Sequence, residues 1–152
     1  MAAYGARIRW RCDGDFAAGN YSRAHRILFD GGADVPASAS PHIVKPPLSD
    51  PAGVDPEEML VASAASCHML WFLDLARGAG FEVREYSDDA TGTLGRDDRG
   101  RVAMTKIILS PQIAFEGPAP SAAQLADLHH QAHERCFIAN TLRCDVEVLS
   151  AG

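Results

Sequence analysis

The chain has 152 residues, 47% of them hydrophobic and 22% charged, which is typical of a single compact domain with one buried core. Its net charge of −6 and its scattered lysines and arginines exclude the dense basic surface that binds nucleic acid. We therefore expect one domain over residues 1–152 and no nucleic-acid partner.

The first residues contain no apolar stretch as long as a signal peptide, and Arg7, Arg9 and Arg11 place charges in the next stretch of chain. The longest uncharged run, residues 59–73, is shorter than the roughly 20 residues that cross a bilayer. We therefore expect a cytoplasmic protein without a membrane partner. We interpret the uncharged run as a buried helix.

Two strands are predicted in the first thirty residues. Residues 4–12 alternate between apolar and polar side chains, as a half-buried strand requires, and this alternation points Cys12 toward the core. A second strand is expected over residues 21–30, whose apolar face would also carry Arg23 and His25. The prolines of residues 31–53 exclude a helix and disfavour a central strand, so we interpret that segment as a long loop.

A long helix is predicted from Asp55 to about Arg77. Asp55 can cap the helix, Pro56 suits its first position, and Glu58 suits the capping-box position three residues after the cap. Gly78 then ends it.

Strands are predicted again after this helix. β-branched and aromatic residues over 81–94 and 101–110 surround a turn at residues 95–100, which indicates a hairpin. A further strand is expected over residues 112–115.

The chain is predicted to close with a helix and a strand. Ser121 is a favourable N-cap for a helix that reaches about Arg135. The alternation over residues 143–149 predicts a final strand with Cys144 facing inward. Because no strand-helix-strand crossover repeats along the chain, we predict an α+β fold with mostly antiparallel sheet and two central helices.

Four cysteines are too few for a disulfide scaffold in a cytosolic chain, where reactive thiols are catalytic or redox-sensing. Cys12 and Cys144 occupy apolar positions on predicted strands, where a free cysteine commonly acts as a small inert hydrophobe. Cys67 and Cys136 lie in or beside helices and have polar neighbours. On spacing alone, Cys67 is explained equally well as a core cysteine and as a catalytic thiol.

Two segments resemble one known family. Residues 55–69, DPEEMLVASAASCHM, resemble the signature of the OsmC/Ohr family, the osmotically inducible protein C and organic hydroperoxide resistance proteins. That signature is Asn/Asp-Pro-Glu-Glu/Gln, an apolar and Ala-rich run, and then Cys. Residues 136–142, CFIANTL, are similar to the family's resolving-cysteine segment. The two motifs follow the family's order, and the order of elements agrees over nearly the whole chain.

The resemblance implies a cofactor-free thiol peroxidase that reduces organic hydroperoxides, with hydrogen peroxide as a further substrate. Cys67 would be the nucleophilic thiol, and Cys136 would resolve it by forming a disulfide. The family works as an intertwined homodimer with active sites at the interface. A small dithiol or lipoyl-type reductant, such as dihydrolipoamide, would regenerate the thiols. No metal is implied.

The resemblance also implies a catalytic arginine, held by the glutamate of the Pro-Glu motif, here Glu57. A guanidinium can lower a thiol's pKa and stabilise the leaving alkoxide. Arg23 is expected on the apolar face of its strand and Arg26 on the opposite face, so Arg23 is our first choice and Arg26 our second. Because an unbroken helix would separate Glu57 from Cys67 by about 15 Å, Glu57 would reach Cys67 only from a partner subunit or across a helix break.

The residues just after Cys67 have less specific roles. Adjacent helical side chains point about 100° apart, which disfavours a direct ion pair of Cys67 with His68. We expect His68 to pack or to line a pocket. Residues 69–72 would line an apolar pocket for an alkyl tail or, as is commoner at helical spacing, form core.

Two rival functions belong to other classes. His129, His133 and Cys136 fall at i, i+4 and i+7 and would share a helix face that zinc accepts, although no fourth ligand is evident nearby. The other rival is a non-catalytic carrier of small molecules with the same fold. Retention of both cysteines argues against a carrier, because a pocket for binding alone needs neither thiol.

Overall fold

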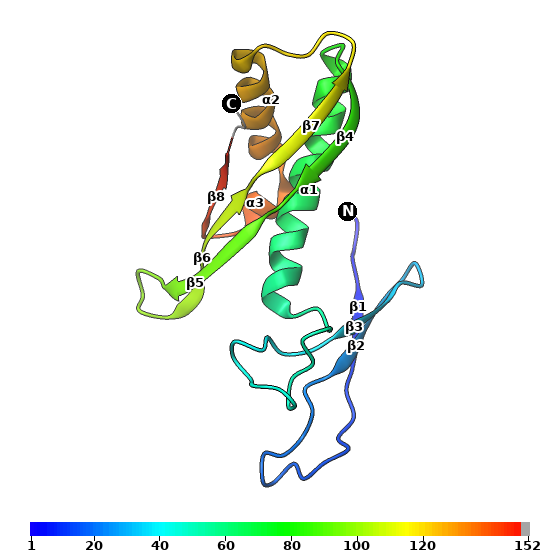
Figure 1. Cartoon of the computed structure of the whole chain (residues 1–152), viewed down its shortest axis with the longest axis vertical. Coiled ribbons are helices and arrows are strands. Elements are labelled where there is room, and N and C mark those ends of the chain that lie inside the picture. The colour runs from blue at the N-terminus through cyan, green and yellow to red at the C-terminus, as the bar shows by residue number, and fades with distance from the viewer. Residues whose placement is uncertain (150–152) are drawn as a thin grey trace. The chain divides into compact units, whose positions relative to one another are not determined.

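The computed structural model describes residues 1–149 (Figure 1). The chain divides into two compact units, Met1–Met59 and Leu60–Gly152. The first unit contains one hydrogen-bonded sheet, and the second contains a two-stranded and a three-stranded sheet. The single domain expected over residues 1–152 stays a prediction.

The first unit contains a three-stranded antiparallel sheet in the order β1-β2-β3. Its strands are β1 (Ala6–Arg9), β2 (His25–Phe29) and β3 (Asp34–Ala37). β3 lies inside the segment expected to be a loop, so that expectation is wrong for these four residues. Pro36 is tolerated there because β3 is an edge strand, where a residue without an N–H need not break the ladder.

β1 is exposed along its whole length, so the prediction of a half-buried strand is wrong. Ile8 retains 61% of its accessible surface. β2 pairs with one edge of β1, β3 pairs with β2, and neither strand covers a face of β1. Trp10 lies past the strand and joins Phe16 and Tyr21 in an aromatic cluster, with ring centroids between 4.8 and 6.1 Å apart. Cys12 also lies past the strand and is half-buried rather than in a core.

The long helix α1 (Pro56–Gly78) begins and ends where the sequence predicts. The Glu58 N–H donates to Asp55 Oδ1 at 2.8 Å, and the Asp55 N–H donates to Glu58 Oε2 at 3.1 Å. This reciprocal pair is a capping box. By length and composition alone α1 would be able to cross a bilayer. Its buried residues recur every four positions, as expected of a helix that packs one face on a core: Ala64, His68, Phe72 and Ala76.

The second unit contains a long bent hairpin (Figure 1). One arm is β4 and β5, the other is β6 and β7, and β8 pairs with β6. The strands are β4 (Glu82–Asp88), β5 (Thr91–Arg96), β6 (Val102–Leu109), β7 (Pro111–Glu116) and β8 (Asp145–Val148). At the bend, the Ser110 N–H donates to Asp88 Oδ1 at 2.6 Å. Pairing is antiparallel except between β6 and β8, so the predicted α+β, mostly antiparallel fold is confirmed.

Two more helices complete this unit, α2 (Ala122–Arg135) and α3 (Phe137–Thr141). Ser121 caps α2 as predicted, because the Gln124 N–H donates to Ser121 Oγ and the Ser121 N–H donates to Gln124 Oε1. No pattern in the sequence indicates α3, since five residues are too few to display a helical period.

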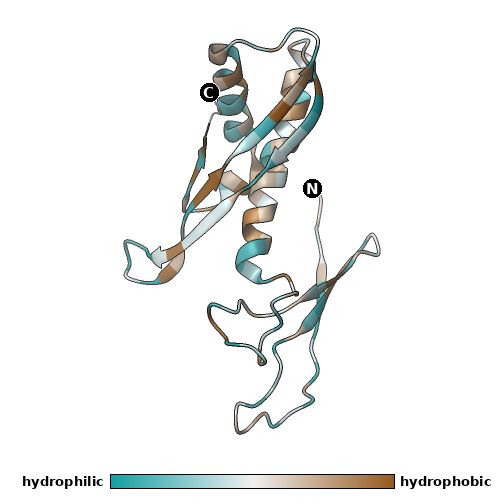
Figure 2. Cartoon of the chain, viewed as in Figure 1, coloured by the Kyte–Doolittle hydropathy of each residue, from teal (hydrophilic) through white to brown (hydrophobic). Residues whose placement is uncertain are grey.

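Two hydrophobic clusters of the second unit meet along α1. One joins the C-terminal half of α1 to α2, β4 and β7 around Phe72, and the other joins its N-terminal half to β6, α3 and β8 around Ile107. Figure 2 shows apolar residues along α1 and on β6, and hydrophilic residues at the tip of the β5–β6 hairpin. Cys67 lies between the two segments of α1 that pack into these clusters.

Candidate active site at Cys67 and Cys136

Cys67 lines an open groove of about 600 Å³ between α1 and α3. Trp71 and Phe137 form its apolar wall, with their rings edge to face at a centroid distance of 5.6 Å. Leu70 and Ile138 extend this wall, and Asp74 contributes a carboxylate to the lining. Cys67 is half-buried and therefore accessible to a molecule that enters the groove. The expected apolar lining holds for Leu70 and Trp71, whereas Phe72 is fully buried in the core.

Cys136 lies at the junction of α2 and α3, where it is the C-cap of one helix and the N-cap of the other. Its side chain is 1% exposed, and its Sγ accepts a hydrogen bond from the Ala139 N–H at 3.4 Å. Burial, and to a lesser extent the neighbouring Cys67 thiol, raises the pKa of the Cys136 thiol to about 11, against the opposing effect of the Ala139 N–H. The two thiols are thus close enough to interact, and Cys136 is protonated near neutral pH.

The remaining cysteines lie elsewhere, and all four are free thiols. Cys144 packs against the cluster around Ile107, and burial raises the pKa of its thiol. Cys12 belongs to the first unit, where its Sγ is 3.5 Å from the Gly14 carbonyl. Among the described residues, the thiol that neighbours Cys136 is therefore that of Cys67.

The two candidate arginines have different surroundings in the first unit. The Arg26 Nε donates to Asp34 Oδ1 at 2.9 Å, which compensates its charge. The Arg23 guanidinium lies 3.8 Å from the centre of the Tyr21 ring and donates to the Tyr21 carbonyl at 2.6 Å. Within residues 1–149, Arg23 forms no ion pair.

Arg23 is expected to lie on the apolar face of a strand and to be held by Glu57. The backbone at Arg23 is not part of β2, which begins at His25, so the predicted strand face does not exist at that position. The Arg23 N–H instead donates to the Leu48 carbonyl. Among the described residues there is no ion pair between Arg23 and Glu57. Glu57 lies in the first turn of α1, which is unbroken as far as Cys67. The catalytic roles of both residues stay predictions.

His68 packs in the interior, one of the two roles predicted for it. Its Nε2 lies 3.0 Å from Nδ1 of His129, and this contact joins α1 to α2. Burial lowers the pKa of His129 to about 4. Burial and the nearby His129 and His133 lower the pKa of His68 to about 4. No signal in the sequence predicts this pair, because the two residues are 61 positions apart.

The three residues proposed as metal ligands do not form a metal site. Within residues 1–149, no group of three or more His, Cys, Asp or Glu side chains has the arrangement to hold a metal ion. The i, i+4, i+7 spacing assumes a helix that includes Cys136. α2 ends before that residue, and His129 is hydrogen-bonded to His68.

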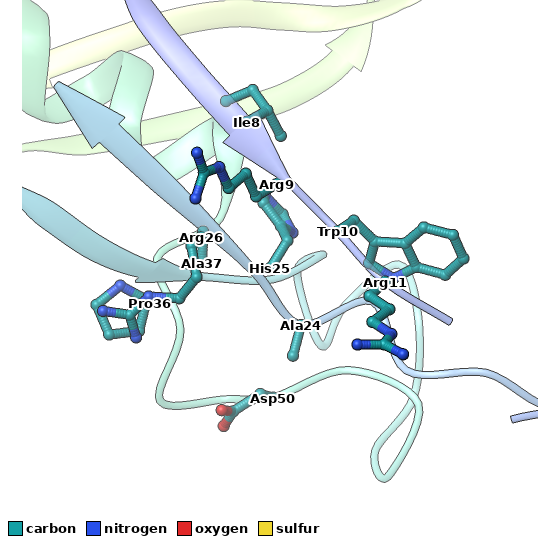
Figure 3. A pocket seen from close by; sticks show the side chains of 10 residues that line it. All are labelled: Ile8, Arg9, Trp10, Arg11, Ala24, His25, Arg26, Pro36, Ala37 and Asp50. Atoms are coloured by element: carbon teal, nitrogen blue, oxygen red, sulfur yellow. The ribbon is translucent and has the colours of Figure 1, made fainter. Parts of the chain in front are cut away.

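A second pocket, of about 720 Å³, lies in the first unit along β1 and β2 (Figure 3). Its lining includes Arg9, Arg11 and Arg26, together with His25 and Asp50. Figure 3 shows the three guanidinium groups pointing in different directions. They do not converge on a common anion, so we assign this pocket no role.

Residues 49–149 match a family model described as OsmC-like protein. The chain belongs to the OsmC-like family. This confirms the assignment that the two cysteine motifs predicted. An OsmC-like protein of unknown function from Vibrio cholerae is 45% identical, with a TM-score of 0.95, over 98% of this chain and 99% of that chain.

More distant structures share the OsmC-like fold. An OsmC-like protein from Mycoplasma pneumoniae has 16% identity and a TM-score of 0.73, over 99% of this chain and 96% of that chain. An organic hydroperoxide resistance protein from Elizabethkingia anophelis has 18% identity and a TM-score of 0.71, over 97% of this chain and 93% of that chain. Curated protein sequences give no significant match.

Proposed function

We propose that this OsmC-like protein is a thiol-dependent peroxidase that reduces organic hydroperoxides, with Cys67 as nucleophile and Cys136 as resolving thiol. One observation carries the proposal: a half-buried thiol in an open groove has a second, buried thiol within interaction range. The names of several relatives, which are organic hydroperoxide resistance proteins, support the same reaction class.

The proposed cycle has three steps. The Cys67 thiolate attacks one peroxide oxygen, the O–O bond breaks, and the departing alkoxide takes a proton to become an alcohol, which leaves Cys67 as a sulfenic acid. The Cys136 sulfur then attacks the Cys67 sulfur, and hydroxide leaves with the Cys136 proton as water. A small dithiol or lipoyl-type reductant finally reduces the disulfide by two thiol–disulfide exchanges.

The high pKa of Cys136 suits a resolving role. A thiol that stays protonated near neutral pH is a poor nucleophile toward peroxide, so Cys136 does not compete with Cys67 for the substrate. When Cys136 attacks the Cys67 sulfenic acid, the hydroxide that leaves can accept the Cys136 proton. The cycle needs no bound cofactor.

The groove supports a preference for peroxides with an apolar tail. Trp71, Phe137 and Leu70 offer apolar surface beside Cys67, and burying such a tail is favourable by about 25 cal/mol per Å². With a dithiol as reductant, we expect cumene hydroperoxide to be consumed with a kcat/KM roughly tenfold or more above that for hydrogen peroxide. A monothiol should support slower turnover than the dithiol.

A peroxidase assay with both substrates and both kinds of reductant tests this function. Equal rates for the two peroxides would contradict the proposed substrate preference but would still support the proposed reaction. Failure to consume either peroxide would favour the rival function, a carrier that uses the groove for binding alone.

We further propose that the protein is a cytoplasmic homodimer with an active site at the subunit interface. The exposure of β1, where Ile8 is 61% exposed and Trp10 beyond it 42%, supports self-association, because a partner subunit would bury this apolar surface. A partner subunit would also bring Glu57 near Cys67.

Light scattering at micromolar concentration should give twice the mass of one chain. A strictly monomeric species would exclude the proposed role of Glu57 across subunits.

A further inference from the structure

The two reactive cysteines lie on or next to two helices that are joined by a buried pair of histidines. His68, on α1, directly follows Cys67, and His129 lies on α2, whose last residue, Arg135, precedes Cys136. The two side chains are 1% and 6% exposed, and Nε2 of His68 is 3.0 Å from Nδ1 of His129. Among the described residues, this is the one side-chain hydrogen bond between α1 and α2.

His133 of α2 also lies near His68, and the His129 ring packs on an apolar side chain. The His129 ring stacks on Phe72 at a centroid distance of 4.5 Å, within the cluster that α1 and α2 share. The hydrophobic effect is non-directional, whereas a hydrogen bond requires one relative placement of its donor and acceptor. The pair therefore adds a directional contact that favours one register of α2 along α1.

The chemistry of the two rings allows this bond near neutral pH. Burial keeps both imidazoles uncharged, with the pKa of each lowered to about 4. One neutral ring donates through its N–H and the other accepts through its bare nitrogen. Removing either ring would leave the remaining nitrogen buried without a partner, which is costly in an apolar interior.

We infer that the hydrogen bond of His68 with His129 positions Cys136 against Cys67, so that this pair sets the rate of disulfide formation and not the rate at which Cys67 is oxidised. The inference rests on the proposed function. His68 and His129 are positioning residues, because they act through the two helices and contact neither sulfur by a hydrogen bond. The peroxide meets Cys67 from the groove, whose lining does not include either histidine.

The variants distinguish the effect of losing the hydrogen bond from the effect of losing the volume of the rings. His68→Leu and His129→Leu remove the bond and retain apolar bulk. The side-chain amide of His129→Asn takes the place of Nδ1 of His129, so His68 keeps a hydrogen-bond partner. The side-chain amide of His68→Gln takes the place of Nε2 of His68, so His129 keeps one as well. His130→Leu, at an exposed position next to His129 on the same helix, is the matched control.

Two rates are measured. Sulfenic acid formation at Cys67 is followed with a trapping reagent after a peroxide pulse, and disulfide closure is followed by the mass loss of two hydrogens. We expect the two leucine variants to close the disulfide about tenfold more slowly, as a misplaced thiol does, with sulfenic acid formation unchanged. His129→Asn, His68→Gln and His130→Leu should close at nearly the wild-type rate. Equal closure rates in wild type and both leucine variants would overturn the inference.

Closure driven by the thiol oxidant diamide keeps this test independent of peroxidase activity. If wild type does not consume peroxide but the leucine variants still close slowly with diamide, the proposed function fails and the positioning role stands. If wild type is an active peroxidase and all variants close the disulfide at the same rate, the proposed function stands and the positioning role fails. Should a leucine variant not fold, His129→Asn is compared with His129→Gln, whose amide extends past the Nδ1 position. Equal closure rates in that comparison would also overturn the inference.

Discussion

Replacing Cys67 with serine is expected to abolish peroxide consumption. A serine hydroxyl is not usefully ionised near neutral pH and is a far weaker nucleophile than a thiolate, and the described lining of the groove contains no second thiol. The loss should be at least about 10³-fold, close to the uncatalysed rate. Cys12→Ser, in the first unit, is the control and should retain wild-type turnover.

Cys136→Ser should give a different result. Without the resolving thiol, Cys67 still forms a sulfenic acid, but excess peroxide then carries it to sulfinic and sulfonic acid. Mass spectrometry after peroxide treatment should show the loss of two hydrogens in wild type and added oxygen atoms in Cys136→Ser. A disulfide found between Cys12 and Cys144, or no disulfide at all, would contradict the proposed pairing.

Arg23→Ala is expected to slow the oxidation of Cys67 by roughly 10²–10³-fold, the usual cost of removing a group that stabilises developing negative charge. Arg23 forms no ion pair among the described residues, whereas Asp34 already compensates Arg26. A nearby guanidinium can stabilise a thiolate and a departing alkoxide. Stopped-flow measurement of the first oxidation step with cumene hydroperoxide gives the rate.

Arg26→Ala is the matched control for this prediction and should change the rate by no more than about threefold, since its exposed ion pair contributes little. The pH dependence of Cys67 alkylation supplies a second readout, which should shift to higher pH in Arg23→Ala. If both measurements change in Arg26→Ala and neither changes in Arg23→Ala, the second-choice arginine is the catalytic one.

Features that depend on nearby residues were predictable from the sequence. The N-terminal ends of α1 and α2 follow from capping boxes, at Asp55 with Glu58 and at Ser121 with Gln124, whose partners are three positions apart. The two cysteine motifs identified the family for the same reason. Each motif is short and lies within or next to one helix.

Features that depend on distant contacts were not predictable. Alternation along β1 indicates which side chains share a face, but not whether anything covers that face. The wall of the groove at Phe137 belongs to α3, which is too short to show a period. The contact of His68 with His129 exists only because two helices far apart in sequence pack together.

The buried histidines also couple unfolding to proton uptake. In the unfolded chain each imidazole would titrate near its ordinary value of 6.5, whereas in the folded chain each takes a proton only near pH 4. Between these values the unfolded state binds more protons than the native state, so the free energy of unfolding falls as the pH falls from 6.5 to 4. Above that window the pair is neutral in both states, and its contribution to stability no longer depends on pH.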